Sequence, residues 1–198
     1  MLVGVVLAGG LSTRMGTDKA GLRHPGSGLS LVQHARLTLV KAGADAAVTS
    51  SNKLPGMLAD NYAHLGPLSG IHAAFTYCAK TYPSSTGLLF LPVDMPNITS
   101  TLLVSLYKQG KAQAKACFYG RQFLPLYLPF TMAYIEYLEY TLASRQNTSL
   151  KAMLNGPLGA VQLDIPTGSE NADAFININQ PNQWAAFQHT QLKTSSNH

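Results

Sequence analysis

Continuous apolar runs alternate along this chain with segments in which apolar residues recur every three or four positions. The runs at 2–8 (LVGVVLA) and 86–94 (TGLLFLPVD) are typical of parallel strands buried on both faces of a sheet. A segment at 115–128 (KACFYGRQFLPLYL) predicts a hairpin of two short strands about Gly120 and Arg121. We expect the other strands at 44–50, 160–164 and 174–178.

Helical spacing fills the intervals between these runs. Ser30 and Gln33 form a capping-box pattern that opens a helix, and Gly43 is placed to end it. Pro181 fits the first turn of the last helix. We expect the other helices at 69–80, 99–109, 131–143 and 148–155. This alternation predicts an α/β fold, a Rossmann-like three-layer sandwich whose mostly parallel sheet carries helices on both faces.

The 198 residues fit one domain, which we place at 1–190, followed by a polar tail at 191–198. Hydrophobic residues make up 46% of the chain and charged residues 12%, a balance that excludes a disordered chain. No apolar run approaches the roughly 18 residues of a membrane span, and we find no signal-peptide pattern. Cys78 and Cys117 form no CxxC pair. We therefore expect a cytoplasmic protein with reduced thiols and no membrane association.

The formal net charge of +5 raises the question of a nucleic-acid partner. Most basic residues are scattered, and only Arg14, Lys19 and Arg23 cluster. We therefore expect no nucleic acid and favour a small polyanionic ligand. The histidines show no zinc-ligand spacing, so His34 and His72, on predicted helices, are expected to be surface or hydrogen-bonded residues.

A glycine loop follows the first predicted strand. Gly9 and Gly10 would let the backbone approach a nucleotide, and Arg14 and Lys19 would neutralise its phosphates. Open α/β sheets bind ligands at the carboxyl ends of their strands, which is where this loop lies. The loop is neither a Walker A motif nor a dinucleotide fingerprint, because the spacing of its glycines differs from both. The alternative is an exposed loop with solvated charges.

One carboxylate stands at the end of a buried strand. The chain has nine acidic residues, and Asp94 alone follows such a strand, with Met95 and Pro96 after it. Mg²⁺ requires carboxylate oxygen, and Asp94 falls where phosphates held by the glycine loop would lie. We predict that Asp94 is a metal ligand; the alternative is an acid that caps the next turn.

Four segments resemble one enzyme family. Residues 7–22 (LAGGLSTRMGTDKAGL) closely resemble the signature LAGGxSxRMGxDKxxL of molybdenum cofactor guanylyltransferases, within the larger nucleotidyltransferase family. Residues 92–96 (PVDMP) are similar to its CDxP motif, and residues 66–71 (GPLSGI) to its GPLAG segment. Residues 175–184 (FININQPNQW) resemble its late N-[IV]-N-T-P-E-D-[LW] motif. The resemblance spans roughly residues 1–188, with the motifs in the family's order.

The resemblance implies a nucleotide-diphospho-sugar transferase-like fold and a Mg²⁺-dependent enzyme. The implied reaction transfers GMP from GTP to the terminal phosphate of molybdopterin, or of its molybdenum-loaded form, with release of pyrophosphate. Cofactor-insertion proteins or apo-molybdoenzymes are implied as partners that receive the product.

The resemblance also assigns residues. The implied catalytic residues are Arg14, Lys19 and Asp94, with Asp94 as the metal ligand, and Asn177 and Asn179 lie on the pterin side. The nucleotide site would comprise Leu7, Ala8, Gly9, Gly10, Lys19, Asn52, Gly66, Pro67, Leu68 and Asp94.

Three alternatives stay open. Related cytidylyltransferases read LAAG where this chain reads Leu7-Ala8-Gly9-Gly10, so GTP is favoured over CTP. Another NTP-dependent nucleotidyltransferase is the second alternative. A non-catalytic nucleotide-binding regulator is the third, because residues 63–65 and 122–125 depart from the family's pattern. The family often has an acid before Gly-Pro-Leu, a place that Asp60 could fill only through a longer loop.

Overall fold

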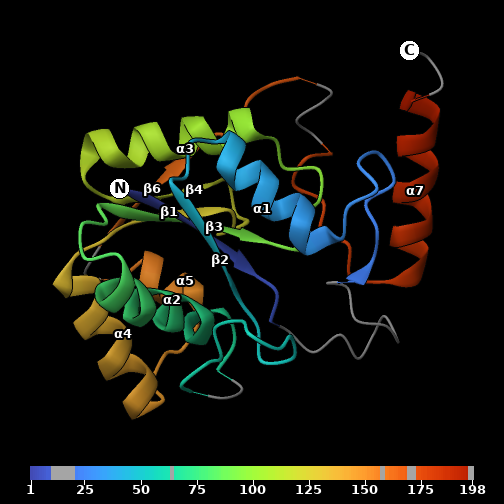
Figure 1. Cartoon of the computed structure of the whole chain (residues 1–198). Coiled ribbons are helices and arrows are strands. Elements are labelled where there is room, and N and C mark those ends of the chain that lie inside the picture. The colour runs from blue at the N-terminus through green and yellow to red at the C-terminus, as the bar shows by residue number, and fades with distance from the viewer. Residues whose placement is uncertain (10–20, 63–64, 157–158, 169–172, 196–198) are drawn as a thin grey trace.

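A six-stranded sheet lies between two layers of helices in a computed structural model that describes residues 1–9, 21–62, 65–156, 159–168 and 173–195 (Figure 1). The strand order is β2-β1-β3-β5-β4-β6, and β5 alone runs antiparallel to its neighbours. The strands are β1 (Leu2–Leu7), β2 (Ala46–Ser50), β3 (Gly87–Pro92), β4 (Ala116–Tyr119), β5 (Leu126–Pro129) and β6 (Ala160–Leu163). The α/β class and the mostly parallel sheet predicted from the sequence are confirmed.

The helices divide between the two faces of the sheet (Figure 1). One face carries α1 (Leu31–Lys41) and α3 (Ser100–Gln113), and the other carries α2 (Pro67–Thr81), α4 (Met132–Ser144) and α5 (Leu150–Leu154). The last helix, α7 (Pro181–Ser195), stands beside these layers at the end of α1 where that helix begins (Figure 1). Among the described residues, no helix combines the length and the apolar character needed to cross a membrane.

Strand β1 shows why the sheet needs both layers. Its side chains point alternately to the two faces, so Val3 and Val5 join the core under α2 and α4 while Leu2 and Val6 join the core under α1 and α3. Gly4 faces α1, and a Cβ there would lie 2.9 Å from Cβ of Leu39. Because β1 is buried on both faces and packed this closely, its sequence is a continuous apolar run rather than an alternation of apolar and polar residues.

The segment before α7 was predicted wrongly. Residues 174–178 form no strand, because Phe175 and Ile178 are buried three positions apart rather than at the spacing of two that a strand requires. The predicted hairpin is confirmed as the antiparallel pair β4 and β5, although residues 120–125 separate the two strands. Helix α7 runs to Ser195, beyond the predicted domain limit at residue 190, and the division into domain and tail remains a prediction.

Candidate active site

The carboxyl ends of three parallel strands meet at the end of β1. The backbone N–H of Ala8 donates to the carbonyl oxygen of Ser50 at 2.9 Å, and that of Val93 donates to the carbonyl oxygen of Leu7 at 3.2 Å. Leu7 and Ala8 are buried between the ends of β2 and β3, whereas Gly9 is exposed. The backbone therefore emerges at the sheet edge where α/β proteins bind their ligands.

Much of the predicted glycine loop lies outside the described residues, which end at Gly9 and resume at Gly21. This excluded part contains Gly10, Arg14 and Lys19, so their predicted roles remain predictions. The chain continues as an exit hairpin, defined here as residues 22–30, in which the N–H of Leu31 donates to the carbonyl oxygen of Leu22 at 2.8 Å.

Asp94 lies in the loop that follows β3, defined here as the Asp94 loop (residues 93–98). It is half-buried, and its carbonyl oxygen accepts a 2.8 Å hydrogen bond from the N–H of Ile178. Since Ile178 stands between Asn177 and Asn179, this bond brings the two predicted pterin-side residues next to the predicted metal ligand. The structure thus joins two motifs that are far apart in the sequence.

A second set of contacts fixes the far end of the Asp94 loop. The side chain of Asn97 donates to the carbonyl oxygen of Asp173 at 3.3 Å and accepts from Nε2 of Gln191 in α7 at 3.0 Å. Gln183 stabilises the start of α7, because its Oε1 accepts from the N–H groups of Asn179 and Gln180. The Asn177–Asn179 segment is therefore held between the Asp94 loop and the last helix.

Asn52 and Asp60 form a reciprocal pair beyond β2. Nδ2 of Asn52 donates to Oδ2 of Asp60 at 2.8 Å, and the N–H of Asp60 donates to Oδ1 of Asn52 at 2.6 Å. The hydroxyl of Ser50, at the end of β2, donates to Oδ1 of Asp60 at 3.4 Å. This pair closes the loop between the strand end and α2, and Asp60 was not predicted as part of the site. No regular spacing in the sequence marks the pair.

The first turn of α2 also points to this strand edge. Gly66 caps the helix with a φ of 70°, a left-handed conformation that favours glycine, and Pro67 occupies the first helical position. A Cβ at Gly70 would lie 2.8 Å from Oγ of Ser50 and 3.1 Å from Cδ2 of Leu7. The helix N-terminus therefore packs directly on the strand ends, with no side-chain cap and no acidic residue in its first turn, an arrangement that favours an anion. Leu68 is fully buried, so it supports the start of α2 from within the core rather than contacting a ligand.

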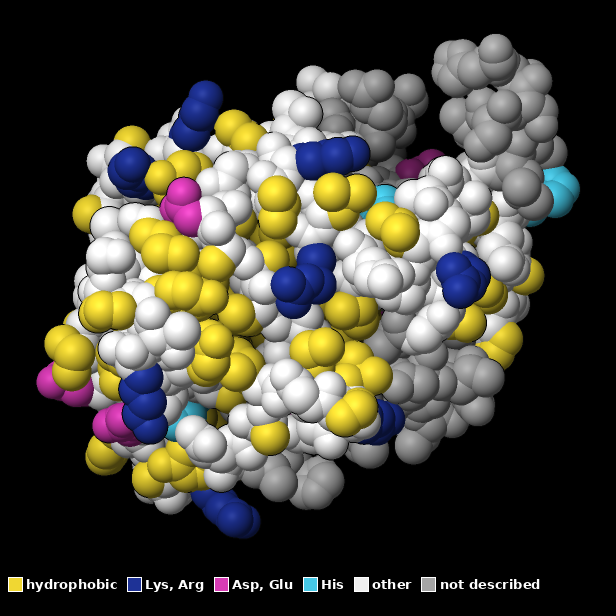
Figure 2. Space-filling model, viewed as in Figure 1, with side chains coloured by type: hydrophobic (Ala, Val, Ile, Leu, Met, Phe, Trp, Pro, Cys, Tyr) yellow, Lys and Arg dark blue, Asp and Glu magenta, His cyan; other side chains and the backbone are white. Residues whose placement is uncertain are grey.

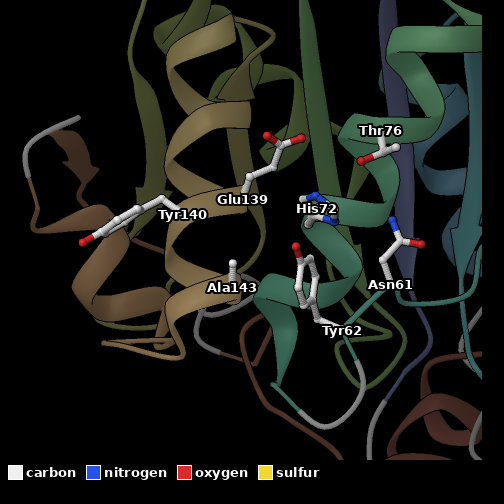
Figure 3. Close-up of a pocket in the computed structure, with 7 residues that line it drawn as sticks. All are labelled: Asn61, Tyr62, His72, Thr76, Glu139, Tyr140 and Ala143. Atoms are coloured by element: carbon white, nitrogen blue, oxygen red, sulfur yellow. The ribbon is translucent and has the colours of Figure 1, made fainter.

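A cavity of about 660 Å³ lies elsewhere, between α2 and α4 (Figure 3). Its lining residues are Asn61, Tyr62, His72, Thr76, Glu139, Tyr140 and Ala143. In Figure 3 the His72 ring lies between Tyr62 and Glu139, while Tyr140 points away from the other labelled side chains. None of the predicted nucleotide or metal residues lines this cavity, so we do not assign the nucleotide to it.

His72 departs from the expectation drawn from its helical position. It is 4% exposed, and within the described part of the chain its Nδ1 has no hydrogen-bond partner. Burial lowers the pKa of His72, and the nearby Glu139 carboxylate raises it in part. His72 is therefore a buried neutral residue rather than a surface or fully hydrogen-bonded one.

Asp94 brings a single carboxylate to the loop at the end of β3. Among the described residues, no three or more His, Cys, Asp or Glu side chains gather to hold a metal ion. A zinc site needs three or four such protein ligands, whereas Mg²⁺ is bound through one or two carboxylates together with water and substrate phosphate. Asp94 fits the second kind of site. Burial raises the pKa of the Cys78 and Cys117 thiols to about 11, which makes both poor metal ligands.

Basic side chains do not gather on the face of the molecule shown in Figure 2, where the Lys and Arg residues stand apart from one another. On this face the positive charge of the chain is distributed among apolar and uncharged residues. Such a surface lacks the continuous basic stripe that characterises nucleic-acid-binding proteins.

These features define an α/β protein whose candidate site lies at the carboxyl ends of its parallel strands, and known proteins give its family. The profile of the MobA-like NTP transferase domain matches residues 4–162. The molybdenum cofactor guanylyltransferase of Xanthomonas euvesicatoria is 34% identical over 187 residues, which cover 94% of each chain. The molybdenum cofactor guanylyltransferase of Rhizobium johnstonii is 32% identical over 191 residues, which cover 91% of this chain and 88% of that protein.

A solved structure agrees with this family. Molybdopterin-guanine dinucleotide biosynthesis protein A from Archaeoglobus fulgidus superposes with a TM-score of 0.70 at 18% identity, covering 98% of this chain and 100% of its own. This likeness confirms the nucleotide-diphospho-sugar transferase-like fold. The chain belongs to the MobA-like NTP transferase family and is a nucleotidyltransferase, as the segment at 7–22 predicted.

Proposed function

We propose that this nucleotidyltransferase transfers GMP from GTP to the terminal phosphate of molybdopterin, or of its molybdenum-loaded form, and releases pyrophosphate. The observation that supports the proposal most is the hydrogen bond from the N–H of Ile178 to the carbonyl oxygen of Asp94, because it joins residues 177–179 to the loop at the end of β3. The relatives that match nearly the whole chain, and are named molybdenum cofactor guanylyltransferases, support the same reaction.

GTP would bind across the strand ends. The exposed backbone at Gly9 and at Gly66, just before α2, is available to the nucleotide, and the exposed Asn52 lies beyond the end of β2. Arg14 and Lys19 would contribute the positive charge that a triphosphate needs. Glycines at positions 9 and 10 leave room for a purine edge, which favours GTP over CTP.

Asp94 would hold Mg²⁺, with Arg14 and Lys19 nearby. When bound, the cation would neutralise charge on the transferred phosphate and on the departing pyrophosphate. The half-buried position of Asp94 at a strand end gives its carboxylate a fixed backbone, since its own carbonyl is held by Ile178.

The acceptor explains why no general base stands out in the sequence. Molybdopterin ends in a phosphate monoester that is already anionic at neutral pH, so its oxygen can attack without losing a proton to a side chain. A new bond forms between this oxygen and the α-phosphorus of GTP, and the bond from the α-phosphorus to the bridging oxygen of pyrophosphate breaks. The protein must hold two anions in line, and the amides of Asn177 and Asn179 would orient the acceptor.

The product is a dinucleotide cofactor that must be passed on. We place the protein in the cytoplasm, where the high pKa of its two buried thiols suits a reduced state. A cofactor-insertion protein or an apo-molybdoenzyme would receive the product.

Pyrophosphate release tests the proposal. Purified protein is given molybdopterin and Mg²⁺ with GTP, CTP or ATP in separate reactions, and we expect release with GTP alone. Release with CTP alone would instead identify a cytidylyltransferase with the same fold. No release with any of the three, from protein that still binds GTP, would identify a non-catalytic nucleotide-binding protein.

A further inference from the structure

Two histidine rings stack between the exit hairpin and α1. His24, in the hairpin, and His34, in α1, have ring centroids 3.8 Å apart and ring planes inclined by only 7°. His24 is 6% exposed and makes an edge contact with Phe187 of α7, at a centroid distance of 5.3 Å. The stack therefore joins the segment that follows the glycine loop to two helices.

The hydrogen bonds fix the proton positions on both rings. Nδ1 of His24 faces the backbone N–H groups of Gly26 and Ser27, each at 3.2 Å, so it must accept and the proton lies on Nε2. Nε2 of His34 lies 3.2 Å from the carbonyl oxygen of Pro96, so it donates, and Nδ1 of His34 lies 3.1 Å from the Ser27 hydroxyl. His24, whose Nδ1 accepts, is neutral in this arrangement. Burial lowers the pKa of each, which agrees with the geometry.

The bond from His34 reaches the loop that carries Asp94. Pro96 is buried two residues after Asp94, and its carbonyl is the point where α1 holds this loop. Ile178 holds the carbonyl of Asp94 from the other side, and Asn97 links the loop to α7. His34 thus connects α1 to the backbone near Asp94, and His24 of the exit hairpin also interacts with the Pro96 backbone.

We propose that His34, braced by His24, is a positioning residue that fixes Asp94 for cation binding through the Pro96 carbonyl. This inference rests on the proposed function, since it takes Asp94 to be the metal ligand. A ligand held by a single carboxylate depends strongly on the backbone that orients it. Partners that orient a metal ligand typically contribute 10- to 100-fold to metal affinity. His34 contacts Pro96, two residues after Asp94, so its action on Asp94 is indirect. We therefore expect its loss to weaken metal binding by about tenfold, the lower end of this range.

Two substitutions at position 34 distinguish the loss of the hydrogen-bond donor from the loss of side-chain volume. His34→Gln keeps an N–H donor near the position of Nε2 and a planar group that can stack on His24. His34→Leu keeps apolar volume but removes the donor. His72→Gln is the control, because His72 is likewise a histidine on a helix, but it lines the separate cavity between α2 and α4.

Direct Mn²⁺ binding gives a measurement that needs no turnover. Free Mn²⁺ is followed by electron paramagnetic resonance with protein saturated by a GTP analogue whose α–β bridge is a methylene group. The quantity compared is the factor by which each protein tightens Mn²⁺ binding over the free analogue. For His34→Leu we expect this factor to be about tenfold smaller than for wild type. For His34→Gln it should lie within about twofold of wild type, and for His72→Gln it should be unchanged.

The possible results distinguish a failure of the positioning role of His34 from a failure of the proposed function. If His34→Leu binds Mn²⁺ as wild type does while Asp94→Asn loses binding, the positioning role is wrong and the role of Asp94 stands. Equal losses in His34→Gln and His34→Leu, matched by equal drops in unfolding temperature, would make His34 a purely structural residue. If wild type binds Mn²⁺ no more tightly than the free analogue, both the metal role of Asp94 and the positioning role are overturned.

Discussion

The N–H of Ile178 donates a 2.8 Å hydrogen bond to the carbonyl oxygen of Asp94, and so the late Asn177–Asn179 segment is anchored to the loop at the end of β3. Ile178 itself is 4% exposed and packs into the molecule beneath this bond. One backbone contact thereby connects the side of the site proposed for the pterin with the side proposed for the metal and the nucleotide.

Removing this contact should affect the acceptor more than the donor nucleotide. Ile178→Pro deletes the N–H, so we expect the KM for molybdopterin to rise about tenfold while the KM for GTP changes less than about threefold. Ile178→Val is the control, because it keeps the N–H and loses only one buried methylene. Equal increases in both KM values would contradict the link between Asn177–Asn179 and the acceptor.

The close packing of α2 on the strand ends gives a second prediction. Gly70→Ala places a methyl group 2.8 Å from Oγ of Ser50, so we expect overpacking to cost about 1 to 3 kcal/mol, reduced by the roughly 1 kcal/mol by which alanine favours a helix. GTP binding should weaken as the N-terminus of α2 moves away from the strand ends. Unfolding in urea and nucleotide titration measure the two effects.

A double-mutant cycle checks the cause. In a Ser50→Ala background the conflicting Oγ is absent, and the Cβ of residue 50 lies at an ordinary 3.6 Å from the added methyl. Gly70→Ala should then cost about 1 kcal/mol less than in wild type. The same cost in both backgrounds would show that Ser50 is not the limiting contact.

The stacked histidines predict how stability depends on pH. Burial and the adjacent His34 ring lower the pKa of His24 to about 4 from its usual 6.5, so the folded state favours the neutral ring. The stabilisation is complete above about pH 6.5 and is lost as the pH falls towards 4, because the unfolded chain takes up the proton first. Between about pH 7.5 and 4.5 this loss amounts to roughly 2 to 3 kcal/mol.

His24→Asn tests this dependence. Asparagine does not titrate, and its Oδ1 can accept from the N–H groups of Gly26 and Ser27 in place of Nδ1. Unfolding free energies measured across this pH range should fall less steeply for His24→Asn than for wild type. Parallel curves would contradict a buried neutral His24.

The sequence predicts most of the sheet because its strands are recognised locally. Strand β1 is buried on both faces, so its run of apolar residues is visible without knowledge of its neighbours. The segment 174–178 is also mostly apolar, but its chain turns at 173–175 and bonds through Ile178 to the Asp94 loop instead of to a strand. Such a choice between a strand and an extended loop depends on tertiary contacts that the local pattern does not contain.

The site was predicted only where a motif carried it. Asp94 and Gly66 stand in recognisable motifs; the structure places Asp94 in the loop after β3 and Gly66 at the start of α2, and their roles stay predictions. The Asn52–Asp60 pair and the His24–His34 stack were not predicted, because each depends on how two distant backbone segments approach one another. A hydrogen bond across eight residues, or a ring stack across ten, has no periodic signature in the sequence.

The role of Asp94 is the central claim, and one comparison of rates tests it most directly. Pyrophosphate release from GTP and molybdopterin is measured for wild type, for Asp94→Asn and for Glu136→Gln, an exposed acid on α4 that serves as the control. We expect Asp94→Asn to lose more than about 100-fold in kcat with its unfolding temperature retained, and Glu136→Gln to match wild type. Wild-type turnover by a correctly folded Asp94→Asn protein would contradict the account.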